Sequence, residues 1–270
     1  MREAAAALAS VSETPRLDAE LLMAAALGVT RSELLVRHLS APAPAGFAAL
    51  FKRRLGHEPV AYIVGRQEFY GLEFRVTRDV LIPRADSETL IDAARETFAG
   101  RAPYTILDLG TGSGALLLTA LTLWPKAAGI GLDRSDPALA VARANAARLG
   151  LAARAEWLCR DWTQPEWRAG LGRFDLILAN PPYVEDDASL ARQVREFEPA
   201  GALFAGPDGL DAYRALVREL PELLAPGAAA LVEIGSRQAA AVTALATATG
   251  LSATPHQDLG GRPRALVLTQ

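Results

Sequence analysis

The stretch "YTILDLGTGSGALLL", residues 104–118, decides how this chain folds. Its first six residues form the short apolar run typical of a buried strand, and its last residues are apolar helix formers. Between them lie Gly110, Gly112 and Gly114, which allow a sharp turn and a close approach of the backbone to a ligand. The start of a helix also offers free N–H groups. We therefore predict a strand, a glycine-rich ligand-binding turn and a helix, with a plain tight turn as the alternative.

The chain beyond this stretch keeps alternating between strands and helices. Further predicted strands end at Asp133, near Asp161 and at Ala179. Strands that alternate with helices imply a mainly parallel sheet covered on both faces, with ligands bound outside the carboxyl ends of the strands. We predict an α/β, Rossmann-like fold.

The first part of the chain has a helical pattern instead. Pro15 opens one predicted helix and Gly28 closes it. After this part, short β-branched and aromatic runs with glycine turns indicate a β-hairpin. We expect a small helical bundle over residues 1–58, a hairpin linker over 59–82 and the α/β domain over 83–270.

The composition favours a cytoplasmic protein without a metal. The 270 residues carry a net charge of −3 with a pI of about 5.7, so there is no basic field to attract nucleic acid. No apolar run is long enough to span a bilayer, and the start lacks the pattern of a secretory signal. Cys159 is the single cysteine, and the three histidines, His38, His57 and His256, lack the spacing of metal ligands. We expect no membrane, nucleic-acid or metal partner.

Acidic and aromatic residues follow the next two strands. Asp133 lies about twenty residues past the glycines, where a carboxylate can accept hydrogen bonds from both ribose hydroxyls of a nucleoside. A helix N-cap is the alternative, for which Ser135 and Asp136 are better placed. Asp161 can meet an adenine amino group, and Trp162 can lie against the ring or simply pack. These residues indicate an adenosine-containing cofactor, without separating NAD from S-adenosyl-L-methionine.

The segment Asn180-Pro181-Pro182-Tyr183 separates the two cofactors. Prolines make it stiff and extended at the end of a strand. A planar, conjugated nitrogen is hard to methylate because its lone pair is delocalised. The Asn180 side-chain oxygen and the Pro181 carbonyl can accept its two N–H bonds and direct the lone pair at a methyl group, while Tyr183 stacks on the planar group. We predict methyl transfer from S-adenosyl-L-methionine, with a structural turn as the alternative.

Five segments carry a resemblance that runs nearly end to end: "RLDAELLMAAALG", "EPVAYIVGRQEFYGLEFRVTRDVLIPR", "ILDLGTGSGALLL", "LANPPYV" and "EFEPAGALFAGPDGLDAYR". With them the chain resembles the N(5)-glutamine methyltransferases of peptide chain release factors, the PrmC/HemK type. The Asn-Pro-Pro-Tyr element alone is shared with adenine-specific DNA methyltransferases and with some RNA and ribosomal-protein methyltransferases. Its combination with the helical segment and the "LIPR" hairpin is far more specific.

The resemblance implies a class I S-adenosylmethionine-dependent methyltransferase fold. It implies an enzyme that converts S-adenosyl-L-methionine to S-adenosyl-L-homocysteine while it methylates the glutamine of a Gly-Gly-Gln loop in a release factor, with the helical domain helping to cradle that protein. We also expect the protein to be a monomer. The implied cofactor-binding residues are Gly110, Thr111, Gly112, Ser113, Gly114, Asp133, Trp162 and Asn180. The implied residues that bind and orient the glutamine amide are Asn180, Pro181, Pro182 and Tyr183.

One segment departs from the family pattern. Family members usually have a second proline and a threonine where this chain reads "PRADSE", residues 83–88. The acidic and hydroxyl characters survive, so we expect this loop to work with more freedom at Ala85.

Two other functions compete with this reading. The first keeps the chemistry and moves the methyl group to an exocyclic amine of a DNA or RNA base, against which stand the acidic pI and the short stretch after Tyr183. The second is a catalytically silent module that docks a partner through the helical domain. An intact Asn180 and an intact glycine loop argue against a loss of catalytic activity.

Overall fold

The computed structural model describes residues 1–39, 41–258 and 260–270, which form two compact units. The helical unit consists of Met1–Arg66, Val76–Arg78 and Leu190–Glu198. The sheet unit consists of Gln67–Arg75, Asp79–Ser189 and Pro199–Gln270. The domain boundaries expected at residues 58 and 82 stay a prediction.

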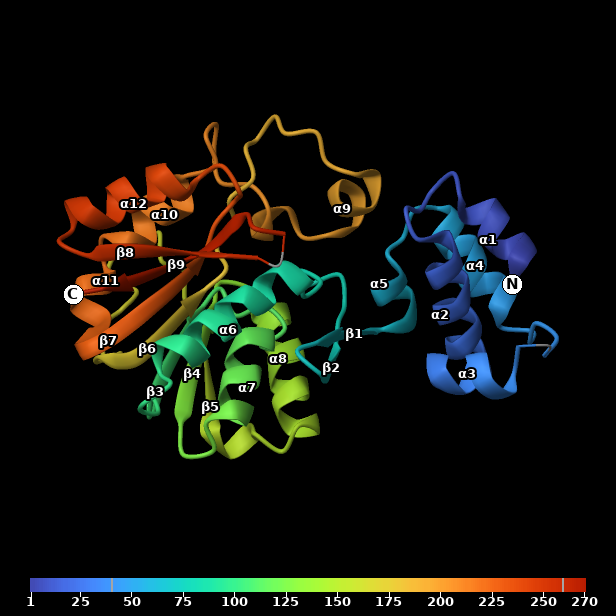
Figure 1. The fold of residues 1–270 in the computed structure, drawn as a ribbon, viewed down its shortest axis with the longest axis horizontal. Helices are drawn as coiled ribbons and strands as arrows, with labels where there is room; N and C mark the ends of the chain where they lie inside the picture. The colour runs from blue at the N-terminus through green and yellow to red at the C-terminus, as the bar shows by residue number, and fades with distance from the viewer. Residues whose placement is uncertain (40, 259) are drawn as a thin grey trace. The chain divides into compact units, whose positions relative to one another are not determined.

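The helical unit is built from short helices around a small apolar core. Its helices are α1 (Arg2–Leu8), α2 (Pro15–Leu27), α3 (Arg31–Arg37), α4 (Phe47–Leu55), α5 (Val60–Val64) and α9 (Arg192–Phe197) (Figure 1). Pro15 is the first residue of α2, and Gly28 ends this helix with a φ of 69°, as predicted. Leu8, Leu22 and Ile63 meet in the buried core.

Residues 60–64 form the helix α5, so the prediction of a strand-like run is wrong for these residues. Their β-branched side chains favour a strand locally, but Ile63 is buried in the core with Leu22. This packing offsets the small cost of placing β-branched residues in a helix. The hairpin is correspondingly shorter, with strands β1 (Arg66–Phe69) and β2 (Leu72–Arg75).

A buried ion pair joins α2 to α4. The Arg54 Nε atom donates to Asp18 Oδ2 at 2.6 Å, and both residues are buried. The same guanidinium donates to the Val11 carbonyl at 3.0 Å. The pair keeps two charges out of water, so the loss of either partner would leave the other charge buried and uncompensated.

The sheet unit holds a seven-stranded sheet within the described residues, in the order β5-β4-β3-β6-β7-β9-β8. Its strands are β3 (Thr105–Leu109), β4 (Ala128–Asp133), β5 (Ala155–Cys159), β6 (Phe174–Ala179), β7 (Leu224–Glu233), β8 (Ser252–Gln257) and β9 (Pro263–Thr269). The first five strands of the order run parallel, and β9 is antiparallel to both of its neighbours. The prediction of a mainly parallel Rossmann-like sheet is confirmed.

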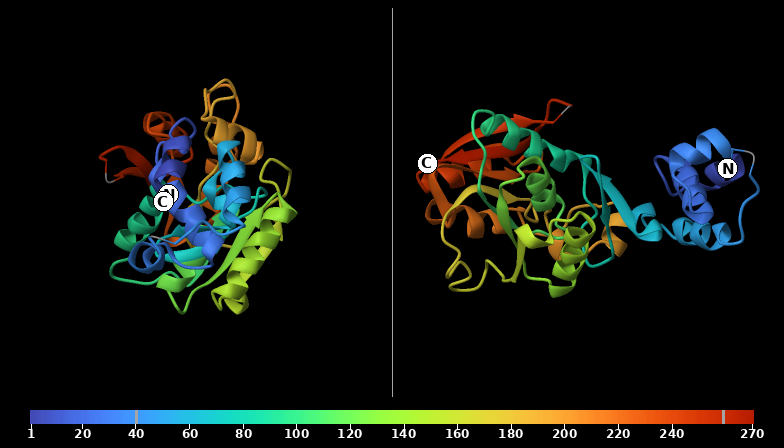
Figure 2. Two further views of the ribbon diagram at one scale, coloured as in Figure 1. Left: turned by 90° about the vertical axis from the view of Figure 1, so that its right-hand side faces the viewer. Right: turned by 90° about the horizontal axis from the view of Figure 1, so that it is seen from below.

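Helices cover both faces of this sheet (Figures 1 and 2). The covering helices are α6 (Glu88–Thr97), α7 (Ala115–Leu123) and α8 (Asp136–Arg148) on one face, and α10 (Asp211–Val217), α11 (Leu220–Leu223) and α12 (Ala239–Ala248) on the other. In β6, Leu176 and Leu178 join the core beneath α6 and α7, whereas Ile177 and Ala179 join the core beneath α10 and α12. Burial on both sides explains why the strands are almost wholly apolar.

One predicted helix is divided. The sequence pattern of "GLDAYRALVRELPELL", residues 209–224, predicts a single helix. The structure instead has α10 and then the separate short helix α11, with Pro221 in its first turn. A proline fits the first turn because its missing N–H has no helical acceptor there, whereas inside a helix it would break the ladder.

We predict that Arg54→Met destabilises the helical unit by about 3 kcal/mol, since Asp18 would stay buried without its partner. Urea unfolding followed by circular dichroism measures this change. Lys52→Met on the same helix is the control, because Lys52 is exposed. Equal midpoints for the two variants would show that the ion pair contributes nothing.

Candidate active site

The register of three neighbouring strands brings the predicted site residues together. Leu109, the last residue of β3, pairs with Leu132 of β4 and with Ala179 of β6. The next residues of these strands therefore lie at one edge of the sheet, and they are Gly110, Asp133 and Asn180. The strand order β4-β3-β6 makes this edge the switch point at which α/β sheets bind their ligands.

The glycine turn after β3 is fixed by backbone contacts. The N–H groups of Gly110 and Thr111 both donate to the Leu132 carbonyl, at 2.8 and 2.9 Å. Gly110 has a φ of 77°, and a Cβ at this position would lie 3.0 Å from the Trp162 ring. Gly114, at the start of α7, has a φ of 81°. Glycine is required at both positions by the backbone conformation, and at Gly110 also by the aromatic ring beside it.

Asp133 supports this turn with its carboxylate. Oδ2 accepts from the Gly112 N–H and Oδ1 from the Ser135 N–H, both at 2.9 Å. Burial raises the pKa of Asp133, although these backbone N–H groups oppose the shift. Ser135 is the N-cap of α8 and accepts from the Ala138 N–H at 3.2 Å, so the cap is Ser135 and not Asp133. Each carboxylate oxygen has a further lone pair for a ligand hydroxyl.

A cavity of about 370 Å³ opens above these strand ends, within the range of ligand pockets. The predicted site residues that line it are Gly110, Thr111, Gly112, Ser113, Asp133, Asp161, Trp162, Asn180 and Pro182. Of the other predicted residues, Gly114 is the N-cap of α7, and none of Gly114, Pro181 and Tyr183 is among the described residues that line the cavity. Glycine backbone, a carboxylate and an indole ring around one cavity fit an adenosine-containing cofactor.

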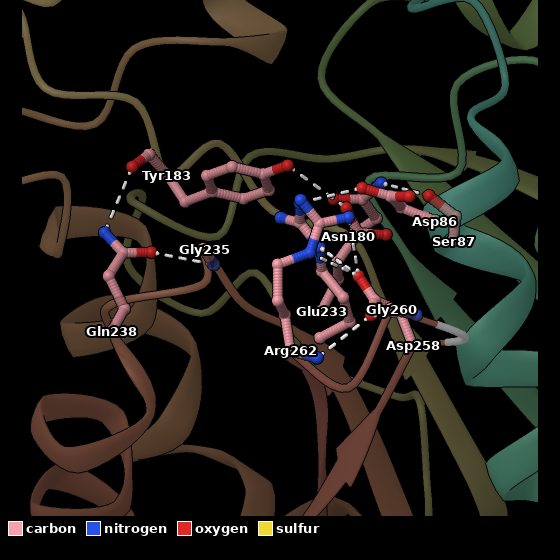
Figure 3. A network of polar contacts seen from close by, with 11 residues as sticks. Asp86, Ser87, Asn180, Tyr183, Glu233, Gly235, Gln238, Asp258, Gly260 and Arg262 are labelled. Carbon is pink, nitrogen blue, oxygen red and sulfur yellow. Dashed lines mark hydrogen bonds and ion pairs between the residues drawn. The ribbon is translucent and has the colours of Figure 1, made fainter.

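The side chain of Asn180 has a defined direction. Its Nδ2 atom donates to Ser87 Oγ at 3.0 Å (Figure 3). Among the described residues none donates to Oδ1, and Asn180 lines the cavity. One end of the amide is therefore held by the protein, while its acceptor end is available to a ligand.

Hydrogen bonds hold the backbone that follows Asn180. Gln238 Nε2 donates to the Tyr183 carbonyl at 3.1 Å and to the Gly209 carbonyl at 3.2 Å. Val184 then pairs with Phe204 in an isolated parallel bridge. The Tyr183 carbonyl thus has its partner inside the protein and is not left for a ligand.

Tyr183, which is half-buried, makes a polar contact with Glu233, which is buried. The Tyr183 hydroxyl donates to Glu233 Oε1 at 3.2 Å (Figure 3). Burial raises the pKa of Glu233 to about 7, and hydrogen bonds from Ser87 and Tyr183 with the charge of Arg264 only partly oppose this shift. Burial also raises the pKa of Tyr183, so its phenol stays protonated and donates.

Known protein families match both units of the chain in sequence. Residues 1–65 match the PrmC N-terminal domain family, and residues 101–245 match the methyltransferase domain family. The release factor glutamine methyltransferase of Cereibacter sphaeroides is 46% identical over 96% of this chain and 92% of its own length. That of Caulobacter vibrioides is 43% identical over 88% of this chain and 83% of its own length.

The chain belongs to the release factor glutamine methyltransferase family. The predicted family and the predicted enzyme class are thereby confirmed. A methyltransferase from Pyrococcus furiosus has a similar fold, with a TM-score of 0.54 and 17% identity over 80% of this chain and 95% of that one. This likeness supports the class I methyltransferase fold. At such low identity it does not indicate the substrate.

Two residues that were not predicted as site residues contact the predicted ones. Ser87 binds Asn180, and Glu233 is the last residue of β7, the strand beside β6. The signal for Glu233 was available, because it is an acidic residue directly after the apolar run "AAALV" at another carboxyl strand end. The hydroxyl of Ser87 was noted as part of the segment 83–88, but its contact with Asn180 was not predicted, because the two residues are far apart in the sequence.

Neither a membrane helix nor a metal site is found in the described part of the chain. No helix there is long and apolar enough to cross a bilayer. No group of three or more potential ligands lies close enough to hold a metal ion within residues 1–39, 41–258 and 260–270.

The raised pKa of Glu233 predicts a pH dependence of stability. Between its model-peptide value of 4.5 and about pH 7 the unfolded chain has lost a proton that the folded chain keeps, so the free energy of unfolding falls as the pH rises through this window. Glu233→Gln should show a shallower fall in urea titrations from pH 5 to 8, with the remainder due to Asp108, whose pKa burial also raises to about 7. Identical slopes for both proteins would contradict the assignment.

Proposed function

We propose that this enzyme transfers the methyl group of S-adenosyl-L-methionine to the side-chain amide nitrogen of the glutamine in the Gly-Gly-Gln motif of a peptide chain release factor. S-adenosyl-L-homocysteine is the second product. The observation that carries the proposal is the direction of Asn180, whose Nδ2 is bound to Ser87 while its carbonyl end belongs to the wall of the cavity. An acceptor placed there suits an NH2 group.

The cofactor is held by the turn and the strand ends around the cavity. The proposed residues are Gly110, Thr111, Gly112, Ser113, Gly114, Asp133, Trp162 and Asn180. Asp133 accepts from ribose hydroxyls with the lone pairs that its backbone contacts leave, and the Trp162 ring, which lies close to Gly110, packs beside the adenine. When bound, S-adenosyl-L-methionine supplies an electrophilic methyl group on a positively charged sulfur.

The residues at the end of β6 bind and orient the glutamine amide. Asn180 Oδ1 and the Pro181 carbonyl accept its two N–H bonds, so the lone pair on nitrogen points at the methyl group. Pro182 stiffens the segment, and the Tyr183 ring, held through its hydroxyl by Glu233, stacks on the planar amide. The S–CH3 bond breaks as the new N–C bond forms. A strong base is not required, since the nitrogen proton then becomes acidic and leaves to water.

The partner is a release factor, as the names of the relatives indicate for those proteins. The helical unit, which matches the PrmC N-terminal domain family, helps to hold this protein substrate. The acidic pI of about 5.7 fits a protein substrate better than nucleic acid. We infer that the enzyme acts as a monomer in the cytoplasm, where release factors work, without membrane or nucleic-acid partners.

The decisive experiment offers the enzyme three acceptors with methyl-labelled S-adenosyl-L-methionine. Purified release factor should become labelled, whereas DNA, RNA and a release factor with the motif glutamine replaced by alanine should not. Asn180→Ala should lower kcat about 100-fold, because an acceptor that orients the nitrogen is lost. Label only in nucleic acid would establish the base-amine reaction instead, and complex formation without transfer would indicate a silent binding module.

Asp133→Ala should raise the dissociation constant of S-adenosyl-L-homocysteine at least about tenfold, since hydrogen bonds to a charged group are worth about 1.5–3 kcal/mol. Isothermal titration calorimetry measures the constant. Asp136→Ala is the matched control, because Asp136 is exposed in the first turn of α8. An unchanged constant for the Asp133 variant would refute its assignment to the ribose.

A further inference from the structure

A buried amide outside the predicted motifs joins two walls of the cavity. Asn145 lies in α8, and none of it is exposed. Its Nδ2 donates to the Ser113 carbonyl at 2.9 Å and to the Arg75 carbonyl at 3.0 Å. Its Oδ1 accepts from the Arg75 N–H at 2.7 Å. Both N–H bonds of the amide and its oxygen are thus used within the protein.

The direction of this amide is fixed by the polarity of its partners. The Ser113 and Arg75 carbonyls can only accept a hydrogen bond, and the Arg75 N–H can only donate one. The reversed amide would place its oxygen against two carbonyl oxygens and its NH2 group against an N–H. In a buried place such contacts are costly. The three hydrogen bonds therefore form together, in one arrangement.

The first wall is the glycine-rich turn. Ser113 lines the cavity, and the peptide unit between Ser113 and Gly114 is held at both ends. The Gly114 N–H donates to the Thr111 carbonyl at 2.8 Å, and the Ser113 carbonyl accepts from Asn145. Gly114 has a φ of 81°, but glycine populates both signs of φ, so its own backbone does not select this conformation. Without Asn145 the Ser113 carbonyl would lose its partner, which favours other conformations of the turn.

The second wall is the hairpin of β1 and β2. Arg75 is the last residue of β2, and Asn145 binds both its N–H and its C=O, as a neighbouring strand would. The paired strand β1 ends at Phe69, which is 1% exposed and lines the cavity. Its ring packs edge-on against Phe74, the residue before Arg75, with 6.3 Å between the ring centroids. The position of Arg75 therefore helps to set the position of Phe69.

We propose that Asn145 is a positioning residue that holds the cofactor-binding turn in its binding conformation and ties it to the hairpin wall of the same cavity. Asn145 is not among the described residues that line the cavity, so its effect passes through Ser113 and Arg75. This inference rests on the proposed function, because it takes the cavity as the site of S-adenosyl-L-methionine.

Loss of Asn145 should weaken cofactor binding and spare turnover. The apparent affinity falls with the fraction of molecules whose turn has the binding conformation, so a turn that is correct one time in about ten binds about tenfold more weakly. At saturating cofactor the ligand itself holds the turn, and kcat is then little changed. A residue that only stabilised the fold would reduce the amount of folded enzyme without raising KM.

The first test measures release factor methylation by Asn145→Ala and Asn145→Asp. Both variants should raise the KM for S-adenosyl-L-methionine and the Kd for S-adenosyl-L-homocysteine about tenfold, with kcat within about twofold of the parent value. The aspartate variant keeps the shape of the side chain but has no N–H to donate, so it separates lost hydrogen bonds from lost volume. Thermal unfolding identifies the folded variants. An unchanged KM in a folded variant, or a fall in kcat alone, overturns the inference.

Arg148→Met is the matched control. Arg148 also joins α8 to β2, through an ion pair with Glu73 at 2.8 Å in which both side chains are 46% exposed. The variant removes a surface contact between the same two elements and leaves Asn145 in place, so its KM should stay within about twofold of the parent value. A rise equal to that of Asn145→Ala would show that any contact between α8 and the hairpin has this effect, and would contradict the assignment to Asn145.

The second test uses the parent enzyme, so it does not depend on the folding of any Asn145 variant. Saturating S-adenosyl-L-homocysteine should slow hydrogen exchange of the Arg75 amide at least about threefold, because the bound cofactor stabilises the turn and, through Ser113 and Asn145, the bond of this amide. Unchanged exchange overturns the inference while the proposed function stands. A parent enzyme that neither binds S-adenosyl-L-homocysteine nor labels a release factor overturns the proposed function and, with it, this inference.

Discussion

The parallel register of β4, β3 and β6 is the constraint on which the site depends. Parallel strands in register end at one level, so the three residues after their last apolar pairs, Gly110, Asp133 and Asn180, share one edge of the sheet although they are far apart in sequence. A slip by one residue would turn the apolar side chains of β6 from one helical layer to the other. The two buried cores of the sheet unit therefore stabilise the geometry of the site as well as the fold.

A second feature is the burial of acidic groups under this edge. Asp108 and Glu233 are both almost fully buried, and burial raises the pKa of each to about 7. Each accepts a hydrogen bond from a neighbouring hydroxyl, Thr111 Oγ1 for Asp108 and the Tyr183 phenol for Glu233. Burying such groups costs free energy that an apolar residue would not, and these hydroxyl contacts offset part of that cost.

Local signals in the sequence predicted much of this structure for identifiable reasons. Proline and glycine mark the ends of α2 in both the sequence and the structure, because their allowed backbone angles are nearly independent of context. The prediction failed for residues 60–64, where β-branched side chains indicated a strand but burial of Ile63 made a helix. It also failed at Pro221, which begins a new helix inside an apparently continuous pattern.

By itself, the sequence determined the class of fold, the glycine turn, the acidic residue one strand later and the Asn-Pro-Pro-Tyr segment, since each depends on residues adjacent along the chain. Only the tertiary structure decided which end of Asn180 meets the cavity. Its Nδ2 end is bound by Ser87, which comes from the turn before α6 and reaches the end of β6 only when α6 packs on the sheet. Hydrogen-bond direction is a property of groups in contact, and such contacts between distant segments exist only in the folded chain.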